Sequence, residues 1–234
     1  MPLTPAQFAA TLDATNLRLD ATAADIRALC AEAATHRCAC VMIYPASVPL
    51  AAQALAGTGM RIGTVIGFPS GRFSTAAKAA EIDAVAAAGA HEVDIVMNYA
   101  ALREGEEAVV AAELAELTAR AHRHGQLVKV ITENCYLNEA QMLAALRLCE
   151  DAGVDFIKTS TGFGSAGAKV EQIALWARHR RGPIKLKAAG GIKTLRDALA
   201  LLDAGAERLG ASSAAALLAE LRGNAAAPAT PGNY

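Results

Sequence analysis

Residues 127–158 read LVKVITENCYLNEAQMLAALRLCEDAGVDFIK, and they contain the clearest signal of the fold. It opens with a short apolar run at 127–131 and closes with another at 155–158. Between them, residues 139–151 have the alanine- and leucine-rich amphipathic pattern of a helix, and Gly153 suits the left-handed turn that often ends one. A strand, a helix and a second strand in this order are typical of a βα repeat whose strands pair in parallel.

The same alternation continues in both directions from this stretch. Further β-branched runs lie before and after it, and amphipathic stretches separate them, with a period of about 30 residues. Glycines follow several of the amphipathic stretches, as helix ends prefer. The further runs are at residues 40–44, 61–66, 92–96 and 184–187, the amphipathic stretches at 76–88, 106–122 and 170–181, and the glycines at Gly89, Gly125, Gly153, Gly182 and Gly205.

Two weaker runs, at 11–15 and 206–210, bring the number of expected strands to eight. Eight βα units in about 220 residues predict a single (β/α)8 barrel, the TIM barrel. An open, doubly wound sheet is the alternative, but that fold usually has fewer strands. We therefore expect one barrel domain over residues 1–224. A flexible tail is expected to follow over residues 225–234, which are rich in alanine and proline.

The composition limits the class of protein. Of the 234 residues, 53% are hydrophobic and 19% are charged, which is typical of a globular chain. The formal net charge of −1 argues against a nucleic-acid or anionic-membrane partner. No apolar stretch approaches the roughly 20 residues of a membrane span, and no secretory signal is recognisable. Five cysteines without framework spacing suit a reducing compartment, so we expect a cytoplasmic protein.

Lys158 ends one of the apolar runs, where a lysine is unusual. A charged, unpaired amine buried in a strand costs several kcal/mol. A lysine there is therefore typical of a neutral amine that attacks a carbonyl carbon and forms a Schiff base. Lys187 stands in a similar setting, just before Gly190-Gly191. Two charged amines on neighbouring strands repel one another, and that repulsion lowers the pKa of an amine.

Other polar residues gather where the expected strands end, on the face where a TIM barrel builds its active site. Lys129 and Glu133 are consistent either with an internal structural ion pair or with a catalytic role. Asp13 is consistent either with a role in the active site or with a cap for the helix after the first strand. For Lys185 we expect a structural role, in a lower layer of the barrel interior or turned outward. The full set at this face is Asp13, Asp94, Asn98, Lys129, Glu133, Lys158, Thr159 and Lys187.

The loops after the seventh and eighth strands predict a phosphate site. They contain Gly190-Gly191 and the run Gly210-Ala211-Ser212-Ser213. Glycine lets backbone N–H groups approach oxygen closely, serine donates a hydroxyl, and TIM barrels usually bind phosphate at these two loops. Tight turns with a serine helix cap are the structural alternative. The histidines lack the spacing of a zinc site, so we expect chemistry without a metal.

Six motifs spread along the chain point to a known family. They are Leu12-Asp13-x-Thr15-x-Leu17, residues 65–71 (VIGFPSG), 92–98 (EVDIVMN), 128–133 (VKVITE), 156–163 (FIKTSTGF) and 187–192 (KAAGGI). Together, over nearly the whole chain from Asp13 to Ser213, they resemble the deoxyribose-phosphate aldolase family. The resemblance implies reversible cleavage of 2-deoxy-D-ribose 5-phosphate into acetaldehyde and D-glyceraldehyde 3-phosphate, without a cofactor.

The resemblance also implies a role for each candidate residue. Lys158 is similar to the family's Schiff-base nucleophile, Lys187 to the nearby cation that keeps it neutral, and Asp94 to the acid/base carboxylate. Tyr234, at the end of the chain, resembles an accessory group for proton exchange; an inert, frayed tail is the alternative. A homodimer is implied as well. The residues expected to contact the sugar phosphate are Asp13, Lys129, Thr159, Gly162, Gly190, Gly191, Gly210, Ser212 and Ser213.

Two other functions fit many of the same residues. One is another lysine-dependent aldolase acting on a related sugar phosphate, and the other is a non-catalytic barrel that senses a sugar phosphate. A sensor needs neither reactive lysine, which argues against it. The sequence departs from the family at Met42, where several relatives carry a cysteine, and at Lys193, where some carry an arginine. Because a thioether is a far weaker nucleophile than a thiolate, Met42 predicts resistance to alkylation by unsaturated aldehydes.

Overall fold

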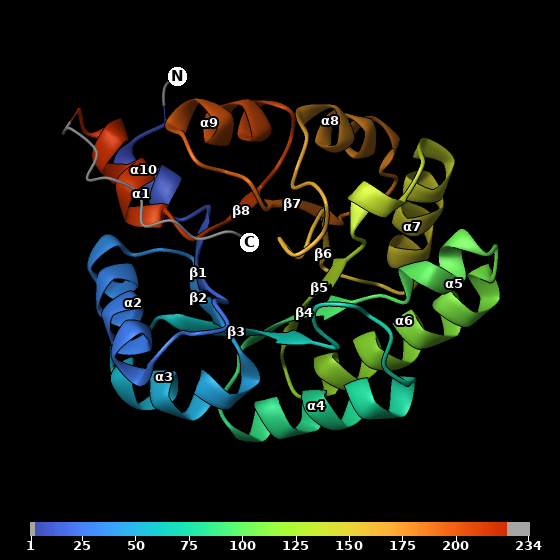
Figure 1. Ribbon diagram of the computed structural model, residues 1–234, viewed down its shortest axis with the longest axis horizontal. Helices are drawn as coiled ribbons and strands as arrows, with labels where there is room; N and C mark the ends of the chain where they lie inside the picture. The colour runs from blue at the N-terminus through green and yellow to red at the C-terminus, as the bar shows by residue number, and fades with distance from the viewer. Residues whose placement is uncertain (1–2, 224–234) are drawn as a thin grey trace.

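The computed structural model describes residues 3–223, and its eight strands form one closed barrel (Figure 1). Each strand pairs in parallel with the next along the chain, and the last strand pairs with the first. The predicted TIM barrel is therefore confirmed, and the open sheet is excluded. The predicted tail, residues 225–234, lies outside the described residues, as does Tyr234.

Strands and helices alternate along the chain as the sequence predicts, and the two weaker runs are strands that begin one or two residues later than expected. The strands are β1 (Leu12–Asn16), β2 (Cys40–Ile43), β3 (Arg61–Ile66), β4 (Glu92–Val96), β5 (Leu127–Ile131), β6 (Phe156–Lys158), β7 (Lys185–Ala189) and β8 (Arg208–Ala211). The helices are α1 (Pro5–Ala9), α2 (Ala23–His36), α3 (Val48–Ala54), α4 (Thr75–Ala87), α5 (Tyr99–Arg103), α6 (Glu107–Arg123), α7 (Glu139–Asp151), α8 (Val170–His179), α9 (Leu195–Asp203) and α10 (Ala214–Leu221).

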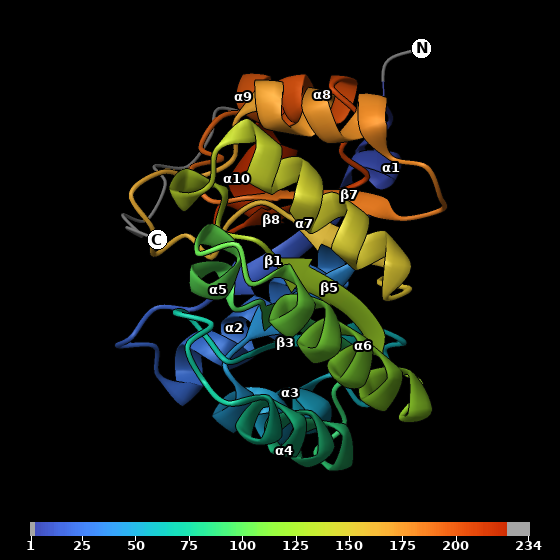
Figure 2. The ribbon, with the colours of Figure 1, turned by 90° about the vertical axis from the view of Figure 1, so that its right-hand side faces the viewer.

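The apolar core lies between the strands and the helices, which surround the barrel on its outside (Figures 1 and 2). In β4, for example, Val93 and Ile95 belong to the same buried cluster as Leu114 and Leu117 of α6. Each buried side chain of this kind contributes about 1.5–3 kcal/mol to folding. Because the helices supply the apolar contacts, the inside of the barrel is left for other residue types.

The helix ends follow local capping rules in most places. Thr22 before α2 and Asn138 before α7 each form a capping box with the third residue of the helix. One predicted helix end is wrong: α8 stops at His179, and the extended backbone of Arg180 ends it before Gly182 is reached. No helix within residues 3–223 is both long and apolar enough to cross a membrane. The predicted terminating glycines that do have positive φ are Gly89, Gly125, Gly153 and Gly205.

Inside the barrel, alternate strands contribute three layers of four residues, as TIM barrels typically do. The strand register and the side-chain contacts identify them. Arg208 lies over the Phe156 ring and close to Glu92, Lys187 contacts Asp13, and Lys158 contacts Asp94. The floor layer is Cys40, Glu92, Phe156 and Arg208; the middle layer is Asp13, Gly63, Lys129 and Lys187; the upper layer is Met42, Asp94, Lys158 and Gly210.

These layers are unusual because charged residues fill them, where Val, Ile and Leu are the usual choice. Gly63 makes room for a long neighbour, because a Cβ there would lie 2.4 Å from Cε of Met42. A Cβ on Gly210 would lie 3.1 Å from Cβ of Ala189, a tight contact. Ion pairs therefore hold the inside of the barrel together.

Candidate active site

A cleft of about 510 Å³ opens at the C-terminal ends of β6, β7 and β8. Six of the predicted site residues line it: Lys158, Gly162, Gly190, Gly191, Gly210 and Ser212. Thr15 also lines the cleft, although no site role is predicted for it. Its position two residues after Asp13 was an available signal, because side chains two apart on a strand share a face. The remaining lining residues are Leu17, Thr161, Ala189, Ile192, Lys193 and Ala211.

Lys158, the last residue of β6, places its amine beside a carboxylate. Its Nζ donates a hydrogen bond to Oδ2 of Asp94 at 2.7 Å, and the side chain is almost fully buried. Burial lowers the pKa of Lys158 to about 8, and the charges of Lys187 and Lys129 add to that effect against the opposing attraction of Asp94. Near neutral pH this amine therefore loses its proton far more readily than an ordinary lysine, which is what a nucleophile requires.

Asp94 is the centre of the charged interior. Its Oδ2 accepts hydrogen bonds from Lys158 and from Lys187, each at 2.7 Å, and its Oδ1 accepts one from Lys129 at 2.9 Å. Burial alone would raise the pKa of Asp94, but the three lysines outweigh burial and hold that pKa well below its usual range. The predicted trio of Lys158, Lys187 and Asp94 therefore meets at one point, although its members come from three different strands.

The alternative ion pair between Lys129 and Glu133 is wrong. Lys129 points into the barrel interior, where it contacts Asp94 of the upper layer and Glu92 of the floor layer, whose Oε2 lies 2.6 Å from its Nζ. Glu133 instead has a left-handed backbone, with φ of 52°, and its carboxylate accepts a hydrogen bond from the backbone N–H of Thr161 at 3.2 Å. The Thr161 hydroxyl donates to the same carboxylate. Burial raises the pKa of Glu133, and the residue holds the loop that follows β6.

Asp13 and Lys185 lie below the cleft. Asp13 does not cap a helix, because its buried carboxylate accepts hydrogen bonds from Lys187 and from Arg208. Burial would raise the pKa of Asp13, but those two cations hold it below its usual range. Lys185 lies lower still, at the rim of the floor layer, with its Nζ 5.6 Å from the centre of the Phe156 ring. That position agrees with the predicted lower layer.

The two glycine loops that line the cleft are held by close backbone packing. Gly190 and Gly191 both have positive φ, and a Cβ on Gly167 would lie 2.1 Å from the carbonyl oxygen of Gly190. Ser213 donates its hydroxyl to the carbonyl of Ile192 at 3.2 Å, so it joins the two loops, whereas Ser212 lines the cleft. Thr159 is buried beneath them and bonds both backbone groups of Ala189.

A second buried ion pair supports β4 from outside the barrel. Lys78 of α4 is fully buried, and its Nζ donates to Glu113 of α6 at 2.9 Å and to the carbonyl of Val96 at 2.8 Å. The other oxygen of Glu113 accepts from the backbone N–H of Asn98 at 2.9 Å. These contacts fix the end of the strand that carries Asp94. Sequence reasoning missed the pair because α4 and α6 are separate in the chain.

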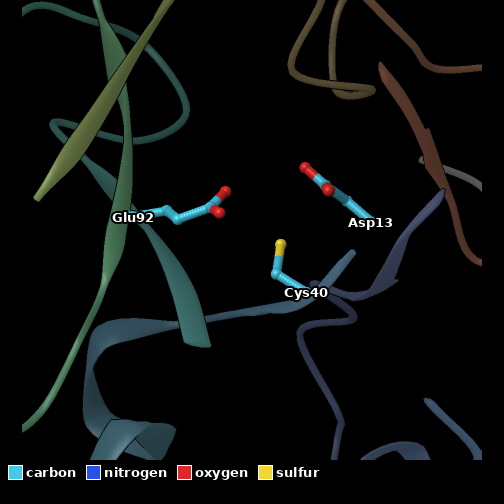
Figure 3. Close-up of side chains that lie close together, drawn as sticks. All are labelled: Asp13, Cys40 and Glu92. Carbon is cyan, nitrogen blue, oxygen red and sulfur yellow. The ribbon is translucent and has the colours of Figure 1, made fainter. Parts of the chain in front are cut away.

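A group of possible metal ligands also lies in the barrel interior. Asp13, Cys40 and Glu92 point toward one another from β1, β2 and β4, with ligand atoms within 4.8 Å (Figure 3). Nη1 of Arg208 lies 2.6 Å from Asp13, 3.9 Å from the sulfur of Cys40 and 3.4 Å from Glu92. Burial also raises the pKa of the Cys40 thiol, which disfavours the thiolate that a metal binds. The arginine therefore occupies the place that an ion would take.

Residues 8–223 match the DeoC/LacD family of aldolases. Two curated relatives named deoxyribose-phosphate aldolase show how far the similarity extends. The chain is 44% identical to the protein from Bacteroides thetaiotaomicron, over 88% of this chain and 87% of the relative. It is 45% identical to the protein from Mycobacterium avium, over 93% of this chain and 98% of the relative.

Solved structures agree with the sequence relatives. A putative deoxyribose-phosphate aldolase from Coccidioides immitis superposes with a TM-score of 0.90 at 36% identity, covering 94% of this chain and 87% of that one. The deoxyribose phosphate aldolase from Aeropyrum pernix, whose structure is tetrameric, superposes with a TM-score of 0.88 at 29% identity, covering 94% and 92%. The similarity therefore extends over nearly all of the barrel.

Proposed function

This chain belongs to the DeoC/LacD family of aldolases, and from that premise we propose that it cleaves 2-deoxy-D-ribose 5-phosphate through a Schiff base at Lys158. The products are acetaldehyde and D-glyceraldehyde 3-phosphate, and the reaction is reversible. One observation carries the proposal: the buried amine of Lys158 lines the cleft with its pKa lowered to about 8, within hydrogen-bonding distance of Asp94. A neutral amine at neutral pH is the group that this chemistry requires.

Imine formation uses the two lysines that share Oδ2 of Asp94. The Lys158 amine attacks C1 of the open-chain sugar, and the carbonyl oxygen becomes the hydroxyl of a carbinolamine. Lys187 supplies the proton with which that hydroxyl leaves as water, and the nitrogen lone pair forms the C=N bond. The product is an iminium ion linked to Lys158.

Carbon–carbon cleavage then uses the iminium as an electron sink. Asp94, by way of a bridging water, takes the proton of the C3 hydroxyl, whose oxygen becomes the aldehyde oxygen of D-glyceraldehyde 3-phosphate.

 The carbon of that aldehyde is C3 itself, which stays bonded to C4, and the bond that breaks joins C2 to C3. The electron pair of the C2–C3 bond moves onto C2 and the iminium, so that an enamine remains on Lys158. Protonation of the enamine at C2 and hydrolysis release acetaldehyde and the free amine.

The phosphate end of the substrate fits the other side of the same cleft. Gly190, Gly191 and Ser212 line that side, and Lys193 adds a positive charge, although as a point charge it lacks the bidentate geometry of arginine. We further propose that the protein acts in deoxyribose breakdown in the cytoplasm and forms a homodimer. The relative from Aeropyrum pernix is a tetramer, so the number of subunits is a matter for measurement.

Reductive trapping tests the proposed function. We expect acetaldehyde and cyanoborohydride to label Lys158 much faster than Lys169, which is exposed on the same chain and serves as an internal reference in the same digest. Because the amine reacts only when neutral, the labelling rate at Lys158 should rise with pH and level off above about 8. Peptide mass spectrometry after short reaction times at several pH values measures both rates.

The trapping experiment has two informative failures. Cleavage of 2-deoxyribose 5-phosphate without preferential labelling of Lys158 would show that the mechanism is wrong. The absence of both labelling and cleavage would favour the non-catalytic sensor. If trapping succeeds but related sugar phosphates are cleaved faster, the chain is the other lysine-dependent aldolase.

Met42 leads to a separate prediction about inactivation. Its side chain is fully buried in the upper layer, and the thiol of Cys40, two residues earlier, has a pKa that burial raises well above its usual value. Both groups are therefore poor nucleophiles toward unsaturated aldehydes. We expect turnover to survive prolonged incubation with crotonaldehyde, and peptide mass spectrometry to find no adduct at either position. The variant Met42→Cys should lose activity under the same conditions; inactivation of the natural chain with modification at Met42 would contradict the prediction.

A further inference from the structure

Six charged side chains form a closed ring inside the barrel, in which three cations and three carboxylates alternate. Each carboxylate contacts two cations of the ring, and one further contact, between Lys129 and Asp13 at 3.9 Å, crosses it. In order, the links are Arg208 to Asp13 at 2.6 Å, Asp13 to Lys187, Lys187 to Asp94 at 2.7 Å, Asp94 to Lys129 at 2.9 Å, Lys129 to Glu92 at 2.6 Å and Glu92 to Arg208 at 3.4 Å.

Lys158 lies outside this ring. It contacts Asp94 only through Oδ2, an oxygen that Lys187 already uses. Three positive and three negative charges cancel within the ring, so a protonated Lys158 would add an uncompensated charge to a buried cluster. Such a charge is costly in a medium that screens poorly, and the neutral amine avoids that cost.

The lower part of the ring reaches far from the cleft. Glu92 and Arg208 belong to the floor layer, and neither lines the cleft. Glu92 also lies 2.8 Å from Nε of Arg61, whose side chain is 47% exposed, so solvent screens that contact more than the buried links. The remaining charged groups around Lys158 are Lys129, Lys187, Asp94 and, on the loop after β5, Glu133.

We propose that Glu92 and Arg208 are positioning residues that act through the charge ring, with opposite effects, to set the protonation state of Lys158. The proposal rests on the proposed function, because it assigns the charge of the Schiff-base lysine to two residues that do not contact substrate. Arg208 orients Asp13 against Lys187, and Glu92 orients Lys129 against Asp94. Both arms end on the carboxylate that Lys158 contacts.

The ring predicts opposite effects for its two floor residues. Glu92→Gln removes one negative charge, leaves the ring with an excess of one positive charge, and disfavours protonation of Lys158. Arg208→Gln leaves an excess of one negative charge and favours protonation. The midpoint of the pH profile for Lys158 labelling should therefore fall in the first variant and rise in the second. A shift of about half a unit to one unit is expected from one charge roughly 10 Å away.

Three further variants separate charge from shape. Arg208→Lys keeps the charge and should keep the midpoint near that of the natural chain. The double variant with Glu92→Gln and Arg208→Gln restores the balance and should also return the midpoint. Lys185→Met is the matched control, because it removes a cation from the rim of the same floor without opening the ring, and it should move the midpoint by much less. Circular dichroism during thermal unfolding checks that each variant folds.

The outcomes distinguish a failure of the positioning role from a failure of the proposed aldolase function. A natural chain that shows no preferential labelling of Lys158 contradicts the proposed function. Normal labelling with midpoints that coincide, or that move in the same direction in both single variants, contradicts the positioning role alone. If Arg208→Gln does not fold, a fall in the midpoint for Glu92→Gln and its return in the double variant support the proposal; an unchanged midpoint for Glu92→Gln overturns it.

Discussion

Replacement of Lys158 by methionine is expected to reduce turnover of 2-deoxyribose 5-phosphate by about 10⁴-fold or more, because no other group can form the covalent intermediate from that position. The fold should be retained. Lys158 is an extra amine beside a balanced ring, so its removal leaves the six ring charges paired, and a methionine fills much of the same space. We therefore expect the free energy of unfolding to stay the same or to increase.

Steady-state turnover and urea unfolding measure these two effects on the same protein. Lys185→Met is again the matched control, since it removes a lysine from the barrel rim rather than from the cleft. A Lys158→Met variant that retains a tenth of the natural turnover would exclude the Schiff base at this residue. A variant that has lost most of its stability would show that Lys158 holds the fold, contrary to the balance of charges described above.

Asp94→Asn should affect both activity and stability. The carboxylate contacts three lysines at 2.7–2.9 Å, and an amide leaves these amines without the charge that compensates them. Breaking a buried ion pair by removing one partner typically costs about 3–5 kcal/mol of stability. Loss of the acid/base group should reduce turnover by about 10²- to 10⁴-fold. The asparagine also removes negative charge from the ring, so the pKa of Lys158 should fall further.

The measurements for Asp94→Asn are turnover, urea unfolding and the pH profile of Lys158 labelling. An exposed carboxylate, Asp203 on α9, provides the control variant Asp203→Asn, which should leave all three unchanged. Retained labelling at Lys158 with lost cleavage would agree with the proposed role, because imine formation and bond cleavage use different proton transfers. Full activity in Asp94→Asn would remove Asp94 from the mechanism.

Much of the fold could be predicted because each βα unit carries its own local signals. The run at 127–131, the amphipathic stretch at 139–151 and the run at 155–158 correspond closely to β5, α7 and β6. The site followed from the fold, since the ends of parallel strands meet at one face of a TIM barrel. Placing Lys158 and Lys187 near one another needed only that rule and the order of their strands.

The charge ring could not be predicted in the same way, because it depends on the register between strands. Whether Lys129 meets Glu133 or Glu92 is decided by how far each strand is shifted along its neighbour, and local sequence does not carry that shift. One signal was available: Glu92 and Asp94 are two residues apart in one strand, so both must face the same side. Arg208 gave no comparable signal, because its partners Asp13 and Glu92 are distant in the sequence.

The ring also links the first strand of the barrel to the last. Asp13 lies in the first strand and Arg208 in the last, 195 residues apart, and their contact closes the barrel. Contacts between such distant residues form slowly, because a long loop must close before any energy is gained. Until β8 joins β1, Asp13 and Glu92 lack the guanidinium that neutralises them on the floor. During synthesis on the ribosome, a chain that has not yet reached Arg208 therefore cannot complete the barrel interior.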